Sequence, residues 1–325
     1  MAEGIRLVFP PQPLEHIRLG TSRVLEAAQS WHVLADPSHH TLHLPWVRAC
    51  RQLPGGLRQQ LRELSFAVRG YLPAFLEAGI GHPDATIEEE TALIRAVPAE
   101  QLIPELVLTM LDWPRDDDFG DPAVQRLVVA AAGGRNGPAR LRRIFADPGK
   151  IRDELLTVIT DYWQACFAAE FGRLEPSLHQ AMEDAARHLA AAGPLGLLRG
   201  LIPEVVPDPA RAAVLIPRSH HHQVAIGDHG GITLVPSVYA WPHVRVTCDH
   251  PPWPLTLTFP VNPLTRPLAS PLTPDQLSRQ LRALAAGLLT RRRQGYYVLY
   301  ATSPEHVSAF LHALGQQLNA QHPGT

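Results

Sequence analysis

The sequence has few cysteines, a single lysine and no long apolar run. The cysteine pattern and the lack of a long apolar run each exclude a class of protein. The three cysteines, Cys50, Cys166 and Cys248, lie far apart without paired spacing. This spacing indicates a reduced setting, with each thiol a small buried hydrophobe, rather than a disulfide framework or a zinc ribbon. No segment approaches the roughly 18 apolar residues of a membrane span, and the first residues lack a basic-then-apolar signal pattern. We therefore expect a cytoplasmic protein with no membrane partner.

Positive charge comes almost entirely from arginine, because Lys150 is the only lysine among 29 basic residues. Residues 262–325 contain six arginines against Asp275 and Glu305, a net charge of +4. The whole chain carries −2, so the remaining 261 residues carry −6. An acidic body with a basic C-terminal segment is typical of a regulator whose tail contacts nucleic acid. Ordinary variation between segments explains the same imbalance, and both interpretations remain open.

Hydrophobic periodicity predicts an α+β fold in which residues 1–261 form a mainly helical N-terminal domain with an antiparallel sheet. The helical pattern predicts a helix that starts at Thr86 and further helices at 18–34, 57–64, 121–132, 138–145, 151–171 and 175–192. After residue 193 the pattern changes to short β-branched runs about ten residues apart. These runs, at 212–217, 223–227, 232–236, 244–248 and 255–259, predict an antiparallel meander of four or five strands.

The segment from 273 to 300 carries the most specific pattern in the chain. Thr273 is a suitable N-cap, Pro274 suits the first helical position, and Gln276 stands where it can bond back to the cap. Four leucines then form one apolar stripe at helical spacing: Leu277, Leu281, Leu284 and Leu288. Away from this stripe lie polar side chains of the kind that contact base edges or phosphates: Gln276, Ser278, Arg279 and Arg282.

A β-hairpin is predicted directly after this helix. Residues 288–292 and 296–300 favour strands, and Gln294-Gly295 supplies the turn between them. Arg291, Arg292 and Arg293 lie near the hairpin tip, where the wing of a winged helix-turn-helix contacts the DNA backbone. With Tyr296, they complete the candidate DNA-binding set. A solvated surface helix and arginines that serve solubility are the alternative interpretation of the same segments.

These residues resemble the end of the helix-turn-helix in ArsR-type bacterial regulators, in which a recognition helix leads into a wing similar to RREGRYVLY. The matching segments are QLSRQLRAL at 276–284 and RRQGYYVLY at 292–300. Upstream blocks resemble an uncharacterised domain that precedes the ArsR-type module in some one-component regulators. They are HTLHLPWVR (40–48), GYLPAFL (70–76), GGITLVPSVYAWPHV (230–244) and DHPPWPLTLTFP (249–260). The resemblance implies a transcriptional regulator that binds double-stranded DNA.

The same resemblance implies a homodimer, because terminal helices commonly build the dimer in ArsR-like proteins. Here the terminal helix is predicted at 304–318, and packing on its own wing is the open alternative. In the family, helices with a DPTRLRIL-like pattern support the recognition helix. Only residues 261–272 fill that place here, and their prolines disfavour helix. We therefore predict a truncated winged-helix module over 262–325, and a ligand- or protein-binding module that has lost DNA binding is the alternative function.

The sequence gives no indication of an enzyme, a metal site or a cofactor. Seventeen histidines include the groups 39, 40 and 43, and 220–222 with 229. Consecutive histidines point in different directions, so they do not converge on a metal, and the cysteine-rich box of metal-sensing ArsR proteins is absent. No nucleophile motif or phosphate-binding glycine loop is present. Six aromatic residues either line a pocket for a small-molecule effector or form core: Trp31, Trp46, Tyr71, Phe75, Tyr162 and Trp163.

Overall fold

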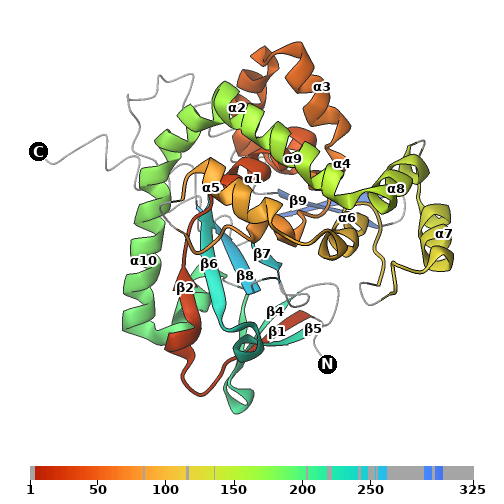
Figure 1. Ribbon diagram of the computed structural model, residues 1–325. Helices are drawn as coiled ribbons and strands as arrows, with labels where there is room; N and C mark the ends of the chain where they lie inside the picture. The colour runs from red at the N-terminus through yellow and green to blue at the C-terminus, as the bar shows by residue number, and fades with distance from the viewer. Residues whose placement is uncertain are drawn as a thin grey trace, which may run out of the picture.

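The structure is a computed structural model that describes residues 4–82, 85–114, 117–134, 136–202, 204–217, 222–240, 243–247, 253, 255–261, 289–294 and 297–302. The predicted recognition helix and the predicted terminal helix at 304–318 lie outside these ranges. Within them the fold is α+β, as predicted, with a helical layer above the strands in the view of Figure 1. None of the described helices combines the length and apolarity needed to cross a bilayer.

The helical layer is built from short helices joined by tight connections. Its members are α1 (Arg23–Ala35), α2 (Leu44–Ala49), α3 (Gly55–Glu63), α4 (Phe66–Arg69), α5 (Ile87–Arg95), α6 (Leu102–Leu108), α7 (Pro122–Ala131), α8 (Gly137–Ala146) and α9 (Pro148–Tyr162). The predicted start at Thr86 is confirmed, because its side chain accepts a hydrogen bond from the Glu89 N–H in a capping box. The predicted start at residue 18 is wrong. Residues 17–19 form a strand, and α1 begins after its N-cap Ser22.

One long helical path connects the helical layer to the sheets. It consists of α9, a π-helical segment (Trp163–Phe167) and α10 (Ala168–Leu201). The two helices predicted at 151–171 and 175–192 are therefore parts of one path. The path bends at Gly193, whose φ of +68° is accessible to glycine without a side-chain clash. Figure 1 shows α10 descending beside β2 and β6, and it contacts both strands.

Two four-stranded sheets follow the orders β3-β4-β1-β5 and β2-β6-β8-β7. Their strands are β1 (Gly4–Val8), β2 (Ile17–Leu19), β3 (Val206–Asp208), β4 (Ala213–Pro217), β5 (His222–Ala225), β6 (Ile232–Ser237), β7 (Arg245–Thr247) and β8 (Leu255–Pro260). The predicted strand positions after residue 193 are confirmed. The predicted antiparallel meander is wrong, because β1 lies between β4 and β5 and pairs in parallel with β5. Strands β2, β6 and β8 are also mutually parallel.

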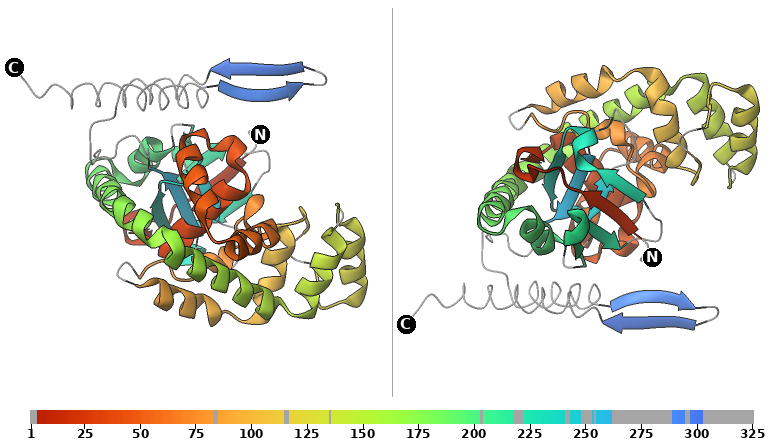
Figure 2. Two further views of the ribbon diagram at one scale, coloured as in Figure 1. Left: turned by 90° about the horizontal axis from the view of Figure 1, so that it is seen from above. Right: turned by 90° about the horizontal axis from the view of Figure 1, so that it is seen from below.

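The N-terminal strands explain why the meander does not form. Residues 4–8 enter the first sheet between β4 and β5, which are neighbours in sequence, and residues 17–19 pair in parallel with β6 at the edge of the second sheet; both N-terminal strands are red in Figure 2. Strand β6 is buried along its whole length and β8 along nearly all of it, as expected for parallel strands that are covered on both faces. One hydrophobic core lies among helices α1 to α9, and the other lies between the strands and α10. The second core is the one that the N-terminal strands help to close.

Candidate functional site

The predicted wing forms a hairpin. Strands β9 (Leu289–Gln294) and β10 (Tyr297–Thr302) pair antiparallel, with Gln294 opposite Tyr297 and Leu289 opposite Thr302. The predicted hairpin is therefore confirmed, with strand ends shifted by one or two residues. Arg291, Arg292 and Arg293 lie in β9, opposite Tyr300, Leu299 and Val298. The other predicted DNA contacts lie outside the described residues: Gln276, Ser278, Arg279, Arg282 and Tyr296.

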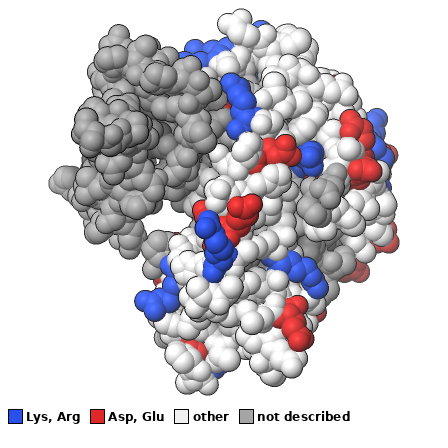
Figure 3. Space-filling model, turned by 90° about the vertical axis from the view of Figure 1, so that its left-hand side faces the viewer, with Lys and Arg blue, Asp and Glu red and all other residues white. Residues whose placement is uncertain are grey.

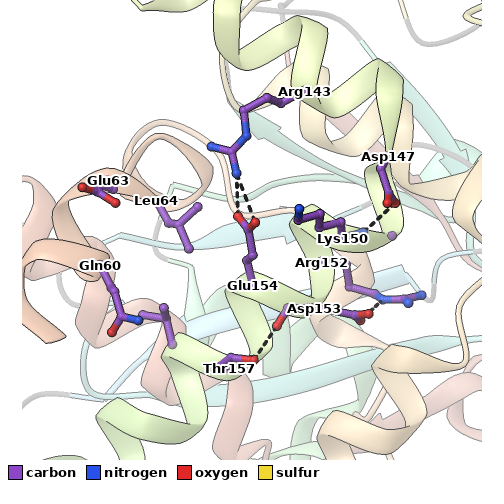
Figure 4. A pocket seen from close by; sticks show the side chains of 12 residues that line it. Gln60, Glu63, Leu64, Arg143, Asp147, Lys150, Arg152, Asp153, Glu154 and Thr157 are labelled. Atoms are coloured by element: carbon purple, nitrogen blue, oxygen red, sulfur yellow. Dashed lines mark hydrogen bonds and ion pairs between the residues drawn. The ribbon is translucent and has the colours of Figure 1, made fainter. Parts of the chain in front are cut away.

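The described surface does not offer a second basic region on the face drawn in Figure 3, where blue and red side chains are interspersed. A groove of about 690 Å³ between α3, α8 and α9 is lined by many charged side chains (Figure 4). Its arginines are engaged within the protein. Arg143 donates to Glu154 at 2.8 Å, and Arg152 donates to Asp153 at 3.0 Å. Both arginines are thus held by carboxylates of the groove itself, so we interpret the groove as surface structure.

A buried polar cluster lies deeper, between the helical layer and the end of β6. We call it the interior cluster, and its members are Glu26, Ser30, Trp46, Tyr162, Glu170 and Tyr239. Two of the upstream sequence blocks meet here. Trp46 of the 40–48 block lies 6.1 Å from Tyr239 of the 230–244 block, measured between ring centroids. These blocks are thus brought together by the fold, although nearly two hundred residues separate them.

Glu26 connects α1 to the turn after β6. Its side chain is 3% exposed, and its Oε1 accepts hydrogen bonds from the backbone N–H groups of Val238 (3.0 Å) and Tyr239 (3.3 Å). Burial raises the pKa of Glu26 from 4.5 to about 7, although these N–H groups and the Ser237 hydroxyl favour the carboxylate. The negative charge of Glu170 raises it slightly further. Glu26 is therefore a buried acid that exchanges its proton near neutral pH.

Tyr162 forms the second connection in the interior cluster. Its hydroxyl lies 2.7 Å from the Ser30 Oγ and accepts the indole N–H of Trp46 at 3.0 Å. Burial raises the pKa of Tyr162 well above its usual range, so the hydroxyl stays protonated. On the other side of the cluster, the Tyr239 hydroxyl donates to Glu170 Oε1 at 3.3 Å. The hydrogen bonds thus join α1, α2, α9 and α10 around one point.

Four histidines continue the interior cluster toward the surface. The His43 ring lies 4.7 Å from the Tyr239 ring, and the His40 ring lies 5.1 Å from His32 and 5.7 Å from His243, all measured between centroids. His40 and His43 are both buried. Among the residues that the structure describes, no group of three or more His, Cys, Asp or Glu side chains has the geometry to hold a metal ion. We therefore interpret these rings as packing.

Further buried glutamates tie the 70–76 block and the residue that follows it to their surroundings. Glu105 accepts the hydroxyl of Tyr71 (3.0 Å) and the N–H of Ala74 (2.6 Å). Glu77 accepts the Thr247 hydroxyl at 2.9 Å and lies 3.4 Å from Arg245. Burial raises the pKa of Glu77, and the Arg245 charge opposes that rise. These carboxylates act as cross-links between helices and strands.

The aromatic residues that we considered for an effector pocket belong largely to the helical core. Trp31, Phe75 and Tyr162 are fully buried in it, and Trp46 and Trp163 pack against it. The core interpretation is confirmed for these five. Glu26 was not among the residues predicted from the sequence. The signal that predicts its burial is that no other charged residue occurs in α1 after Arg23, which is typical of a helix covered on all sides.

Comparison with known proteins identifies the family of this chain. No curated protein and no solved structure matches this chain. A family model, described as a family of unknown function (DUF5937), matches residues 7–264. All four upstream blocks lie inside the matched residues, and the match ends before the predicted recognition helix. Because the match covers well over half of the sequence, the chain belongs to the DUF5937 family.

Proposed function

We propose that the protein is a DNA-binding transcriptional regulator whose C-terminal segment, 262–325, carries a shortened winged-helix module. The observation that supports this most is the β9–β10 hairpin, which has three consecutive arginines in its first strand and a two-residue connection. The sequence predicts an amphipathic helix directly before this hairpin, with Gln276, Arg279 and Arg282 off its apolar stripe, and this is the order of a recognition helix and a wing.

The charge of the hairpin and the positions of its arginines along β9 favour contact with the sugar-phosphate backbone of DNA. Successive strand positions alternate between faces, so positions 291 and 293 share one face and position 292 occupies the other. A hairpin that lies along a sugar-phosphate backbone therefore presents arginine on either face. The net charge of +4 over 262–325 adds a long-range attraction to DNA that salt weakens. Double-stranded DNA is thus the partner that this segment fits best.

In this proposal the family domain, residues 7–264, is the sensory part, and it works in the cytoplasm in response to an unidentified small-molecule effector. The predicted recognition helix has an apolar stripe, but the short proline-containing segment 261–272 leaves no room for the supporting helices of ArsR-type modules. The helix requires another surface for Leu277, Leu281 and Leu284, and a second copy of the chain supplies one in a homodimer. Two-fold symmetry would also place two wings on one duplex.

A gel shift with the purified chain and the DNA upstream of its own coding region tests the proposal. We expect a shifted band at low salt that disappears at high salt, because phosphate contacts dominate the affinity. Replacing Arg291, Arg292 and Arg293 together with alanine should remove the shift. The matched control is Arg58→Ala, which removes an exposed arginine of α3 and should leave the shift unchanged.

Absence of a shift at low salt with the wild-type protein would overturn the proposal. That outcome favours the alternative, in which the chain is a ligand- or protein-binding module that has lost DNA binding. A shift that persists in the triple-arginine variant would remove the hairpin from the DNA contact. Circular dichroism of each variant would show whether a lost shift reflects lost contacts or lost folding.

A further inference from the structure

Cys50 and Cys166 lie in contact although 116 residues separate them in the sequence. Both are part of the helical core: Cys50 is buried in it, and Cys166 packs against it. Cys50 begins the 3-10 turn η4 (Cys50–Gln52) that follows α2, and Cys166 belongs to the π-helical segment between α9 and α10. The fold therefore brings together two cysteines that show no paired spacing in the sequence.

The register of two helical faces explains this contact. Trp46 donates its indole N–H to the Tyr162 hydroxyl at 3.0 Å. Cys50 follows Trp46 by four residues, and Cys166 follows Tyr162 by four, so each thiol lies one helical turn beyond an aromatic partner. The backbone N–H of Cys50 bonds to the Trp46 carbonyl, and the Cys166 thiol lies 3.6 Å from the Tyr162 carbonyl. The thiol pair is thus the next contact along the same interface.

The two thiols have different environments. Cys50 is buried, whereas Cys166 is half-buried and follows two exposed residues, Gln164 and Ala165. The interaction with Cys50 lowers the pKa of Cys166, and the interaction with Cys166 together with burial raises the pKa of Cys50. Because the thiolate is the reactive form of cysteine, Cys166 is the thiol that a small oxidant meets first. Cys50 is then within reach as the resolving thiol.

We propose that Cys50 and Cys166 form an oxidation site for hydroperoxides that closes to an intramolecular disulfide. With hydrogen peroxide, the Cys166 thiolate attacks one peroxide oxygen and the O–O bond breaks, which gives a sulfenic acid at Cys166 and a hydroxide that is protonated to water. The Cys50 sulfur then attacks the Cys166 sulfur, the S–O bond breaks, and the oxygen leaves as a second water with the Cys50 proton. With hydrogen peroxide, two thiols and one peroxide give one disulfide and two waters.

This disulfide would fasten the end of α2 to the junction of α9 and α10. The junction lies beside the interior cluster, because Phe167 follows Cys166 and its ring lies 5.7 Å from the Tyr239 ring. Oxidation at this point therefore acts where the helical layer and the end of β6 are joined. The inference concerns the family domain and is independent of whether the C-terminal segment binds DNA.

The test uses the full chain, reduced and freed of reductant, then exposed to hydrogen peroxide. Remaining thiols are alkylated with N-ethylmaleimide under denaturing conditions, and the protein is digested without reduction for mass spectrometry. We expect a peptide in which Cys50 is linked to Cys166, cleaved by dithiothreitol, and Cys248 recovered as the alkylated thiol. Wild-type protein unfolded in urea before oxidation should lose the preference for this link, because the fold creates the contact.

Two variants assign the roles of the thiols. In Cys50→Ser, dimedone should label a sulfenic acid at Cys166, because no resolving thiol is present. In Cys166→Ser, we expect loss of both the linked peptide and the dimedone label. Recovery of Cys50 and Cys166 as alkylated thiols from folded wild-type protein, at a large excess of peroxide, would overturn the proposal. A disulfide from either residue to Cys248 in its place would also overturn it, and neither result depends on the variants.

Discussion

Replacing Glu26 with a residue that cannot ionise should make the free energy of unfolding fall less as the pH rises. The substitution Glu26→Gln keeps a carbonyl oxygen that can accept the Val238 and Tyr239 N–H groups, which lie 3.0 and 3.3 Å from the native Oε1. It removes the group whose pKa is raised from 4.5 to about 7 by burial. The change therefore isolates one buried ionisation in an otherwise similar site.

The sign of the effect follows from linkage between protonation and folding. The folded protein holds the Glu26 proton more tightly than the unfolded chain, so this contribution to stability is complete below pH 4.5. It is lost as pH rises from about 4.5 to about 7 and is absent above that range. A shift of this size corresponds to about 3 kcal/mol in the free energy of unfolding.

Urea denaturation of both proteins between pH 4.5 and 8.5 measures this effect. The free energy of unfolding of Glu26→Gln minus that of the wild type should increase by about 3 kcal/mol across this range, since other titrating groups cancel in the difference. For the exposed control Glu183→Gln, the difference in the free energy of unfolding from the wild type should change by less than about 0.5 kcal/mol over the same pH range. A difference between Glu26→Gln and wild type that stays constant with pH would refute the assignment of a raised pKa to Glu26.

Two further substitutions test the packing around the interior cluster and the sheets. Tyr162→Phe removes the hydroxyl that accepts the Trp46 indole N–H and should cost about 2 kcal/mol in urea denaturation at pH 7; an unchanged midpoint would contradict the hydrogen bond. Gly231→Ala should destabilise by roughly 2–3 kcal/mol, because its φ is +129° and a Cβ would lie 2.6 Å from the His16 carbonyl oxygen. The control is Gly133→Ala, because a Cβ at Gly133 would meet open space. Equal melting temperatures for the two variants would exclude the steric explanation for Gly231.

Local signals in the sequence were sufficient for several elements of the fold. The capping box at Thr86 and Glu89 places the start of α5, because both partners lie within one helical turn. The β9–β10 hairpin is similarly local, since its turn and both strands lie within fourteen residues. These elements depend on neighbours in the chain, which a single sequence displays directly.

Features that depend on distant parts of the chain were not accessible in the same way. The meander prediction failed because β1 inserts between β4 and β5, a pairing that no local pattern encodes. The contact between Cys50 and Cys166 requires α2 and the π-helical segment to pack in register, so the thiols looked unrelated in the sequence. The burial of Glu26 was accessible in principle from its apolar surroundings in α1.

The central claim is that the C-terminal segment contacts the phosphates of duplex DNA. Fluorescence anisotropy of labelled upstream DNA, titrated with protein at several salt concentrations, measures this directly. If about four arginines per subunit contact phosphates in a dimer, the log–log slope of affinity against salt should be roughly −7, and Arg292→Ala should reduce it by about one per subunit. A slope near zero, or one that Arg292→Ala leaves unchanged, would contradict the claim.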